Sequence, residues 1–201
     1  MSLAGAVTIV LAGTYTYLTD QTDGRLAVGR LGLPYAGASL AITQENLIGE
    51  PMRAPLPEAI APCLWRVRVG YRRNWLPMSD SDVVPYPTLT ETQRQELKET
   101  ERLVISADVT RRSWHPAAGD AVLHSLFDSQ ADAQALADFL LAMFAPAREL
   151  WELPLANTGH GIALNDNISV AWPRGGLADG KNLRVVGRTV SSNKVSLLGF
   201  G

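Results

Sequence analysis

The chain has 201 residues, of which 46% are hydrophobic and 19% are charged, and its formal net charge is −2 at pH 7. These values are typical of a folded protein with one domain or two small ones, and they exclude a disordered chain. The small net charge gives no basic field that would attract nucleic acid, so we expect no nucleic-acid partner. Because Cys63 is the only cysteine, no disulfide can form within the chain.

The first fifty residues predict short β-strands. Val7–Leu11 is a β-like apolar run. No basic residue precedes the apolar stretch Ala4–Ala12, so we expect no signal peptide, and no segment has the length of a membrane span. Two further runs, Tyr15–Leu18 and Leu26–Leu31, flank a polar loop that closes with Asp23-Gly24, which is typical of a hairpin.

A strand over Ser39–Ile42 and a helical turn over Gln44–Asn46 are expected next. Residues 51–62 contain four prolines, which neither a helix interior nor a central strand tolerates. We therefore expect an extended connection there. It would separate a β-rich segment, residues 1–62, from a β-rich domain with two helices, residues 63–201. The first segment would be the end of an upstream domain.

The clearest strand is Leu64–Arg72, because its side chains alternate strictly in character. One set is apolar and the other is basic: Trp65, Val67, Val69 and Tyr71 alternate with Arg66, Arg68 and Arg72. The basic face is either a solvated surface or a contact strip for phosphate or an acidic partner. No aromatic residue shares that face, which disfavours single-stranded nucleic acid.

Two helices are predicted in the second half of the chain. Thr90 and Gln93 have the spacing of a capping box, and Thr90–Arg102 holds good helix formers but few apolar residues, as on a surface helix. Gln130–Ala145, with Ser129 as its N-cap, has an apolar stripe that should pack across a sheet.

Between these helices we expect strands over Leu103–Val109 and Val122–Leu126, joined by a loop over Arg111–Asp120.

Residues 150–201 predict a compact series of strands joined by tight turns. Apolar residues recur at every second position: Trp151, Leu153 and Leu155; Ile168, Val170 and Trp172; Leu183 and Val185; Val195 and Leu197. Glycine, asparagine and proline mark the turns between them. The whole chain therefore predicts an α+β fold that is mostly antiparallel β, with β-rich lobes, one amphipathic helix packed on a sheet and a smaller surface helix.

No motif identifies catalytic, cofactor-binding or metal-ligating residues. His115, His124 and His160 lack the spacing of metal ligands, and no carboxylate–histidine motif accompanies them. Gly24–Gly32 is not followed by the lysine and helix of a phosphate loop. No serine stands in a nucleophile elbow. We therefore expect no enzyme, no cofactor and no bound metal.

A set of segments occurs in a fixed order along the chain. They are Gly24–Leu31, Trp65–Trp75, Leu164–Val170, Pro173–Leu177 and Gly180–Gly187. Together these segments resemble large bacteriophage and prophage tail proteins of the tail-tip or baseplate-hub type. The resemblance extends from about residue 15 to residue 201. Asn165 stands where that family usually has glycine before the aspartate, and asparagine tolerates the left-handed conformation that such a turn requires.

The resemblance implies a structural part of a virion tail, made in the bacterial cytoplasm, with no catalytic residues. The implied partners are other tail or baseplate proteins, and the implied assembly is a homo-oligomer, a trimer, in the full particle. It also implies a longer natural chain with this piece at its C-terminal end. We take Arg66, Arg68 and Arg72 as the candidate contact surface. The alternatives are a carbohydrate- or host-surface-binding module that uses Trp75 and Trp114, and, last, a hydrolase.

Overall fold

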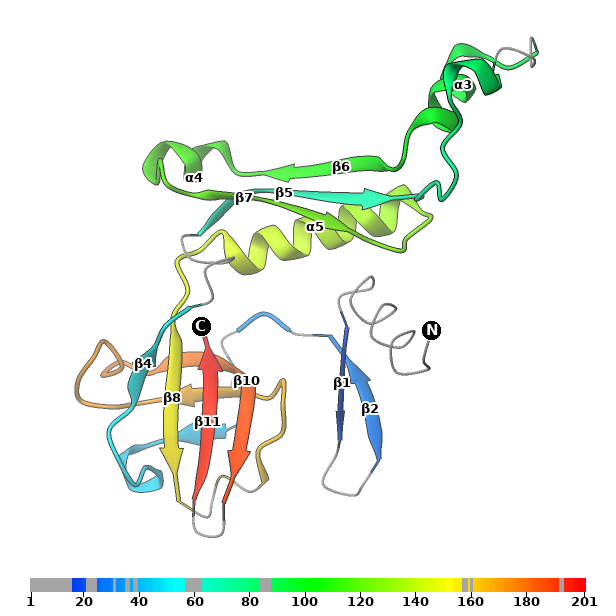
Figure 1. Ribbon diagram of the computed structural model, residues 1–201. Coiled ribbons are helices and arrows are strands. Elements are labelled where there is room, and N and C mark those ends of the chain that lie inside the picture. Colours follow the sequence, from blue (N-terminus) through cyan, green and yellow to red (C-terminus); the bar gives the residue numbers. More distant parts are fainter. Residues whose placement is uncertain are drawn as a thin grey trace. The chain divides into compact units, whose positions relative to one another are not determined.

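The computed structural model describes residues 16–20, 25–30, 32–34, 37, 40–56, 63–83, 88–156, 159, 161–191 and 194–201. Their elements form two compact units (Figure 1), which we call the inserted unit, residues 63–146, and the split unit, residues 16–56 and 147–201. The expected division placed residues 63–201 together, whereas residues 147–201 group here with residues 16–56, because strands from both segments share one sheet. That residues 1–62 end an upstream domain stays a prediction.

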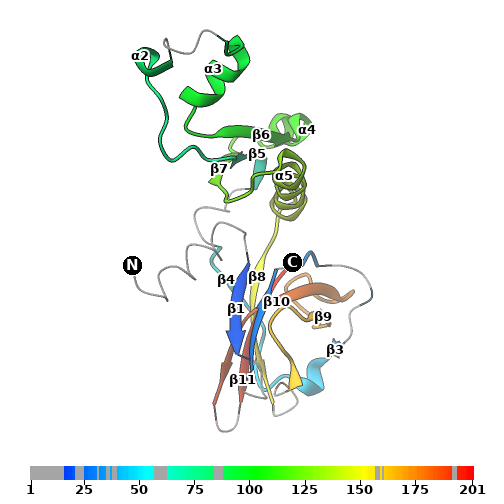
Figure 2. The ribbon, with the colours of Figure 1, turned by 90° about the vertical axis from the view of Figure 1, so that its right-hand side faces the viewer.

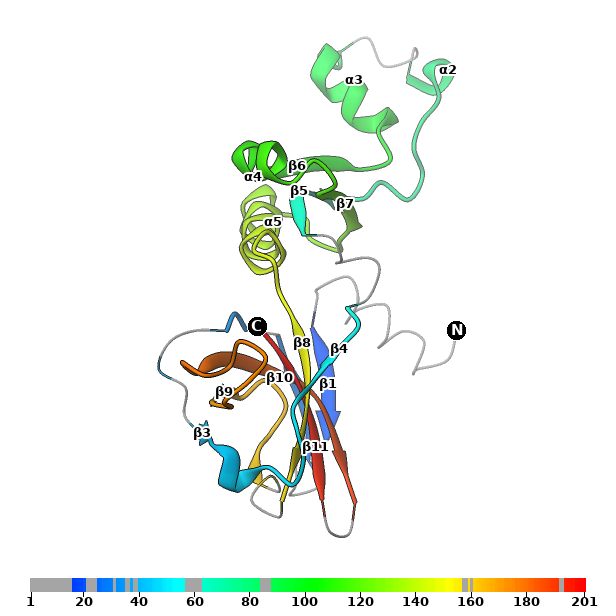
Figure 3. The same cartoon turned by 90° about the vertical axis from the view of Figure 1, so that its left-hand side faces the viewer.

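The split unit is built on a six-stranded sheet with the order β3-β9-β10-β11-β8-β4. Its strands are β3 (Leu40–Ile42), β4 (Met52–Ala54), β8 (Leu150–Leu155), β9 (Asn167–Val170), β10 (Lys181–Val190) and β11 (Val195–Phe200). Neighbours are antiparallel except β3 and β9, which are parallel. The sheet curls, so that β3 and β9 lie to one side of β8 and β11 (Figures 1 and 3).

The core of the split unit lies inside this curl. It contains the apolar residues that the period-two pattern predicted on β8, β9, β10 and β11, together with Ile42, Ile162 and Leu177. Leu153, Ile168 and Leu197 are fully buried. The opposite side of β8 and β11 is mixed and less buried: it carries Leu198 as well as Glu152, whose Oε1 accepts from Ser196 Oγ at 3.0 Å. The alternation of each strand thus separates core from surface, as predicted.

The turn at Asn165 also confirms a prediction from the sequence. Asn165 adopts a left-handed conformation with φ of 69°. Its side chain holds a neighbouring segment, because Oδ1 accepts from the Gly32 amide at 2.7 Å and Nδ2 donates to the Arg30 carbonyl at 3.1 Å. The buried Arg184 donates to the carbonyls of Asn165 and Leu33, both at 2.6 Å. These bonds fasten Arg30, Gly32 and Leu33 to the sheet.

The N-terminal elements largely follow the sequence. The hairpin consists of β1 (Tyr17–Asp20) and β2 (Leu26–Gly29), which are antiparallel, and η1 (Gln44–Asn46) is the predicted helical turn. In the proline-rich stretch, β4 occupies an edge of the sheet, which is where strands near proline are tolerated. Val7–Leu11 and residues 57–62 lie outside the described residues.

The inserted unit has a three-stranded sheet with the order β6-β5-β7. β5 (Leu64–Tyr71) is antiparallel to β6 (Arg102–Ala107) and parallel to β7 (Gly119–His124). The helix α5 (Gln130–Phe144) lies along one face of this sheet (Figures 1 and 2). Its buried residues are Ala133, Leu136, Ala137, Leu140 and Met143, and Ser129 caps its first turn. The predicted amphipathic helix on a sheet is therefore confirmed.

The remaining helices are short and include two that the sequence analysis missed. The surface helix α3 (Glu91–Lys98) carries the predicted capping box at Thr90 but ends four residues before Arg102, which begins β6. α2 (Asp80–Val83) was not predicted. The loop expected over Arg111–Asp120 is wrong at both ends, because α4 (Val109–Trp114) extends into it and β7 begins at Gly119. Asp108 Oδ1 caps α4 by accepting from the Arg111 amide at 2.9 Å.

The fold class is the predicted one: an α+β fold, mostly antiparallel, with β-rich lobes. The parallel exceptions are the β3–β9 and β5–β7 pairs. Among the helices of the described residues, none combines the length and apolarity needed to cross a membrane.

Candidate contact surfaces of the inserted unit

The candidate site begins with the two arginines in the middle of β5. Val67 and Val69 point to the buried face, where α5 packs, so Arg66 and Arg68 point to the opposite face. The register places Arg66 beside Asp120 of β7. We call the side of the three-stranded sheet that faces away from α5 the open face.

Asp120 binds both arginines. Its Oδ2 accepts from Arg66 Nε and Arg68 Nη2, each at 3.0 Å, and also from Arg66 Nη2. Its Oδ1 accepts from Arg68 Nε at 3.3 Å. The hydrogen bond from Arg66 lowers the pKa of Asp120 below its ordinary value, burial partly opposes this, and Arg68 lowers it further. One carboxylate therefore accepts hydrogen bonds from two guanidinium groups.

Arg72 does not belong to this group, which corrects the predicted row of three arginines. β5 ends at Tyr71, and Arg72 takes a left-handed conformation with φ of 51°. Its amide donates to the Phe127 carbonyl at 2.7 Å, and its Nε lies 3.7 Å from Asp128 Oδ1. The chain thus turns at the position where continued alternation would have placed a third arginine on the open face.

Apolar residues that the sequence analysis did not select flank the arginines. Ile105 of β6 and Val122 of β7 are the register partners of Arg68 on either side, and they are 53% and 46% exposed. Leu103 lies one row further along β6 and is also exposed. A signal for them exists in the sequence: both strands carry three consecutive apolar residues, Leu103–Ile105 and Ala121–Leu123. Such a strand is apolar on both faces and not on one alone.

An acidic group and a histidine lie at the other end of the open face. Glu101 Oε1 and His124 Nδ1 are 2.6 Å apart. The Glu101 carboxylate occupies the space above Gly70, where a side chain at position 70 would meet it. Glycine at position 70 therefore allows this carboxylate to lie against the sheet.

A third arginine adds positive charge near Arg66. The guanidinium groups of Arg66 and Arg112 both lie 4.5 Å from the ring centroid of Trp65. Arg112 belongs to α4, so Trp65 joins this helix to β5 through cation–π contacts.

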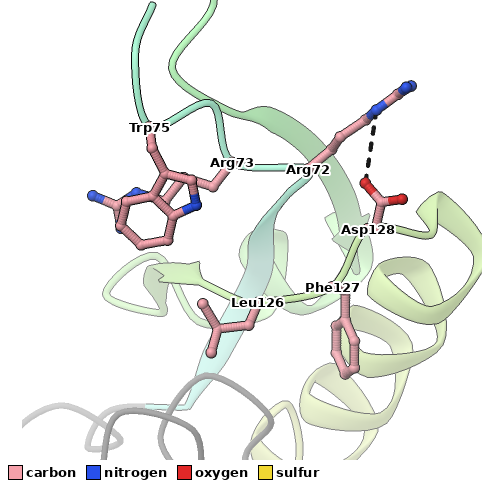
Figure 4. Close-up of a pocket in the computed structure, with 6 residues that line it drawn as sticks. All are labelled: Arg72, Arg73, Trp75, Leu126, Phe127 and Asp128. Carbon is pink, nitrogen blue, oxygen red and sulfur yellow. Dashed lines mark ion pairs between the residues drawn. The ribbon is translucent and has the colours of Figure 1, made fainter. Parts of the chain in front are cut away.

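A separate cavity of about 210 Å³ lies where β5 and β7 end. Its lining includes Arg73, Trp75 and Leu126 (Figure 4). Arg73 stacks on Trp75 with 4.7 Å from guanidinium to ring centroid, whereas Arg72 points away from Trp75 toward Asp128. The two arginines therefore do not converge on one ligand position. Trp75 and Trp114, the aromatic residues of the alternative hypothesis, are each 70% exposed.

Within the part of the chain that the structure describes, no cluster of three or more His, Cys, Asp or Glu residues could hold a metal ion. His115 ends α4 and His124 pairs with Glu101, while His160 lies outside the described residues. That the chain has no catalytic residue and no cofactor stays a prediction.

The fold of this chain is similar to the folds of solved tail proteins. The prophage tail protein gp18 from Listeria monocytogenes is 7% identical, with a TM-score of 0.51, over 98% of this chain and 52% of that one. The tail protein from Neisseria meningitidis is 12% identical, with a TM-score of 0.50, over 94% of this chain and 52% of that one. The 43 kDa tail protein of prophage MuSo2 from Shewanella oneidensis is 12% identical, with a TM-score of 0.47, over 92% of this chain and 50% of that one.

The chain thus spans about half the length of each of these solved proteins. No protein-family model matches it, and neither does any curated protein. The fold resemblance to prophage tail proteins that the sequence indicated is confirmed.

Proposed function

We propose that this chain is a structural component of a phage or prophage tail and acts through protein–protein contacts. The observation that carries the proposal is the shared fold, which covers nearly the whole chain in the Listeria and Neisseria tail proteins. The sequence segments that suggested a tail protein independently form part of this fold. Leu164–Val170 and Gly180–Gly187, for example, contribute the Asn165 turn and the β9–β10 pair.

Within the tail, the proposed position is the tip, hub or baseplate, and the proposed assembly is a homo-oligomer, a trimer, in contact with other tail proteins. The proposed location is the virion tail after synthesis in the bacterial cytoplasm. Arg66, Arg68 and Arg72 remain the proposed contact residues, although Arg72 is separate from the other two. A structural role needs shape and contact surfaces only, so the proposal includes no enzymatic activity.

The proposal is tested in a strain that carries the gene on an inducible prophage. Particles are purified after induction, and their tails are analysed by mass spectrometry and electron microscopy. The expected result is that the protein is present in tails and that its deletion prevents complete tails until an intact copy is supplied. Complete, infectious particles that lack the protein would contradict the proposal. The number of copies around the tail axis in the electron-microscopy reconstruction tests the trimer.

The second candidate is a carbohydrate-binding module at the cavity beside Trp75, because an exposed tryptophan next to a cavity suits a sugar ring. A glycan array distinguishes this function. Selective binding that is lost in Trp75→Ala but kept in Trp114→Ala would favour it over a purely structural role.

A further inference from the structure

The open face of the three-stranded sheet presents its side chains in ordered rows. The central row is Ile105, Arg68 and Val122, with the arginine between two exposed aliphatic side chains. On one side lies the row of Arg66 and Asp120, and on the other lies Leu103. We propose that this face binds a protein partner whose surface presents a carboxylate surrounded by aliphatic side chains. This inference rests on the proposed structural role and specifies the chemistry of one contact.

The charges on the face indicate the charge of the partner. Arg66 and Arg68 direct their Nε and Nη2 groups at Asp120, so in this part of the face one negative charge balances two positive ones. The other carboxylate on the face, that of Glu101, lies in the next row against His124. The Nη1 group of each arginine makes no hydrogen bond within the described residues. Arg112, stacked on the same tryptophan as Arg66, adds a further positive charge nearby. A partner carboxylate would complete the pairing that Asp120 begins.

Asp120 also prepares the arginines for binding. Two long side chains that are already held by a shared carboxylate lose less conformational entropy when a partner arrives. The aliphatic neighbours contribute in a different way. Ile105 and Val122 would exclude water from a carboxylate bound at Arg68, and removal of water strengthens the ionic contact.

The apolar rows select a protein partner over nucleic acid. A phosphate backbone would gain from the arginines but would leave Ile105, Val122 and Leu103 against a charged, hydrated strand. A second copy of the same face is also disfavoured. A two-fold contact centred on the row of Arg68 would place each Arg68 opposite its own counterpart, and like charges at the centre of an interface oppose association.

The first experiment maps the contact in assembled tails. The photo-crosslinking amino acid p-benzoylphenylalanine is placed at position 105 of the full-length protein in particles. A matched variant carries it at Val190, which is 50% exposed in the split unit, compared with 53% for Ile105. The expected result is a crosslink from position 105 to a different tail protein, at a peptide whose Asp or Glu lies among aliphatic residues, and none to that peptide from position 190.

The second experiment measures the contact with the purified partner. Ile105→Glu and Arg68→Glu are each expected to weaken binding at least about tenfold, because both place a negative charge in front of the partner carboxylate. Lys194→Glu makes the same charge reversal as Arg68→Glu, at an exposed turn of the split unit, and should leave binding unchanged. Changing the mapped partner carboxylate to Lys should restore binding to Arg68→Glu. Arg68→Glu also removes the ion pair with Asp120 and brings a second carboxylate close to it. Ile105→Glu tests the face while leaving the ion pairs of Asp120 with Arg66 and Arg68 intact.

Several results would overturn the inference: a crosslink only to nucleic acid or to a second copy of the chain, no crosslink from position 105, or full-strength binding by a folded Ile105→Glu. These results differ from failure of the proposed function. If the proposed tail role were wrong, the protein would be missing from tails altogether. If only the inference about the open face were wrong, the protein would be present in tails but would make its contacts through another surface.

Discussion

The two units of this molecule treat the two faces of a β-sheet differently. In the split unit the sheet curls around its own apolar face, and residues from both ends of the sheet, such as Ile42 and Leu155, meet in one core. In the inserted unit a single helix covers one face, and the other face keeps Leu103, Ile105 and Val122 exposed. The difference lies in how each unit uses its main sheet: the split unit encloses the apolar face of its sheet in a core. The inserted unit retains apolar surface that a folded domain does not need for itself.

The largest expected effect compares a core residue of the split unit with an exposed residue on the open face of the inserted unit. Leu197→Ala, in the core of the split unit, should lower the free energy of unfolding by about 2–5 kcal/mol, because it leaves a cavity among buried side chains. Ile105→Ala, on the open face, should change it by less than about 0.5 kcal/mol. Urea unfolding measures both. Equal losses would mean that Ile105 is part of the core, and the comparison would fail.

The next effect concerns the turn at Asn165, which fastens Arg30 and Gly32 to the sheet of the split unit. Asn165→Ala should cost about 2 kcal/mol, because alanine is strained at a φ of 69° and cannot form the bonds to Arg30 and Gly32. Asn165→Gly removes the same bonds without the strain and should cost about 1 kcal/mol. If thermal or urea unfolding gives the alanine and glycine variants the same stability, backbone strain has no part in this turn.

A smaller effect is expected at α4 in the inserted unit. This helix has no buried residue, so its capping side chain should matter more than its packing. Asp108→Ala should cost about 1 kcal/mol, whereas Asp108→Asn, which keeps a capping oxygen, should cost little. Hydrogen exchange of residues 109–114 reports the local change. Unchanged protection in the alanine variant would show that the cap does not hold this helix.

The smallest effect is the pH dependence that Asp120 adds. Its pKa in the folded protein is lowered, so its contribution to stability is present above the unfolded-state pKa of about 3.9 and is lost as the pH falls through the folded value. Asp120→Asn should therefore be slightly less stable than the parent protein at pH 7, and the difference should vanish in strong acid. Asp179→Asn, in an exposed turn, serves as the control. A difference that grew on acidification would reverse the sign of this linkage.

Local chemistry made much of the fold predictable. The alternation in β8 and β11 depends on side chains two positions apart, the stripe of α5 on the helical period, and the cap at Thr90 on a spacing of three residues. The turn at Asn165 was predictable for the same reason, since few residues other than glycine tolerate its backbone conformation. α4 was missed because Val109 favours a strand, and the capping role of Asp108 was not recognised.

The contact surface was only half predictable from the sequence. Alternation in β5 separated Arg66 and Arg68 from the buried valines, but it could not show that β5 ends before Arg72. Nor could it show that Asp120, more than fifty positions away, binds both arginines. That pairing exists because β7 lies parallel to β5 in one particular register, which depends on the connection through β6 and α4.

The sequence by itself therefore determined the faces of the strands, the amphipathic helix and the caps, because each depends on residues within one or two turns of chain. Tertiary structure alone decided which strands are neighbours. The pairing of β3 with β9 joins residues more than 120 positions apart, and it is what closes the core of the split unit. In the β6-β5-β7 sheet, the alternation of β5 already marked the valine face as the buried one, but β6 and β7 are apolar on both faces, so only the strand pairing decided that Ile105 and Val122 flank Arg68 on the open face.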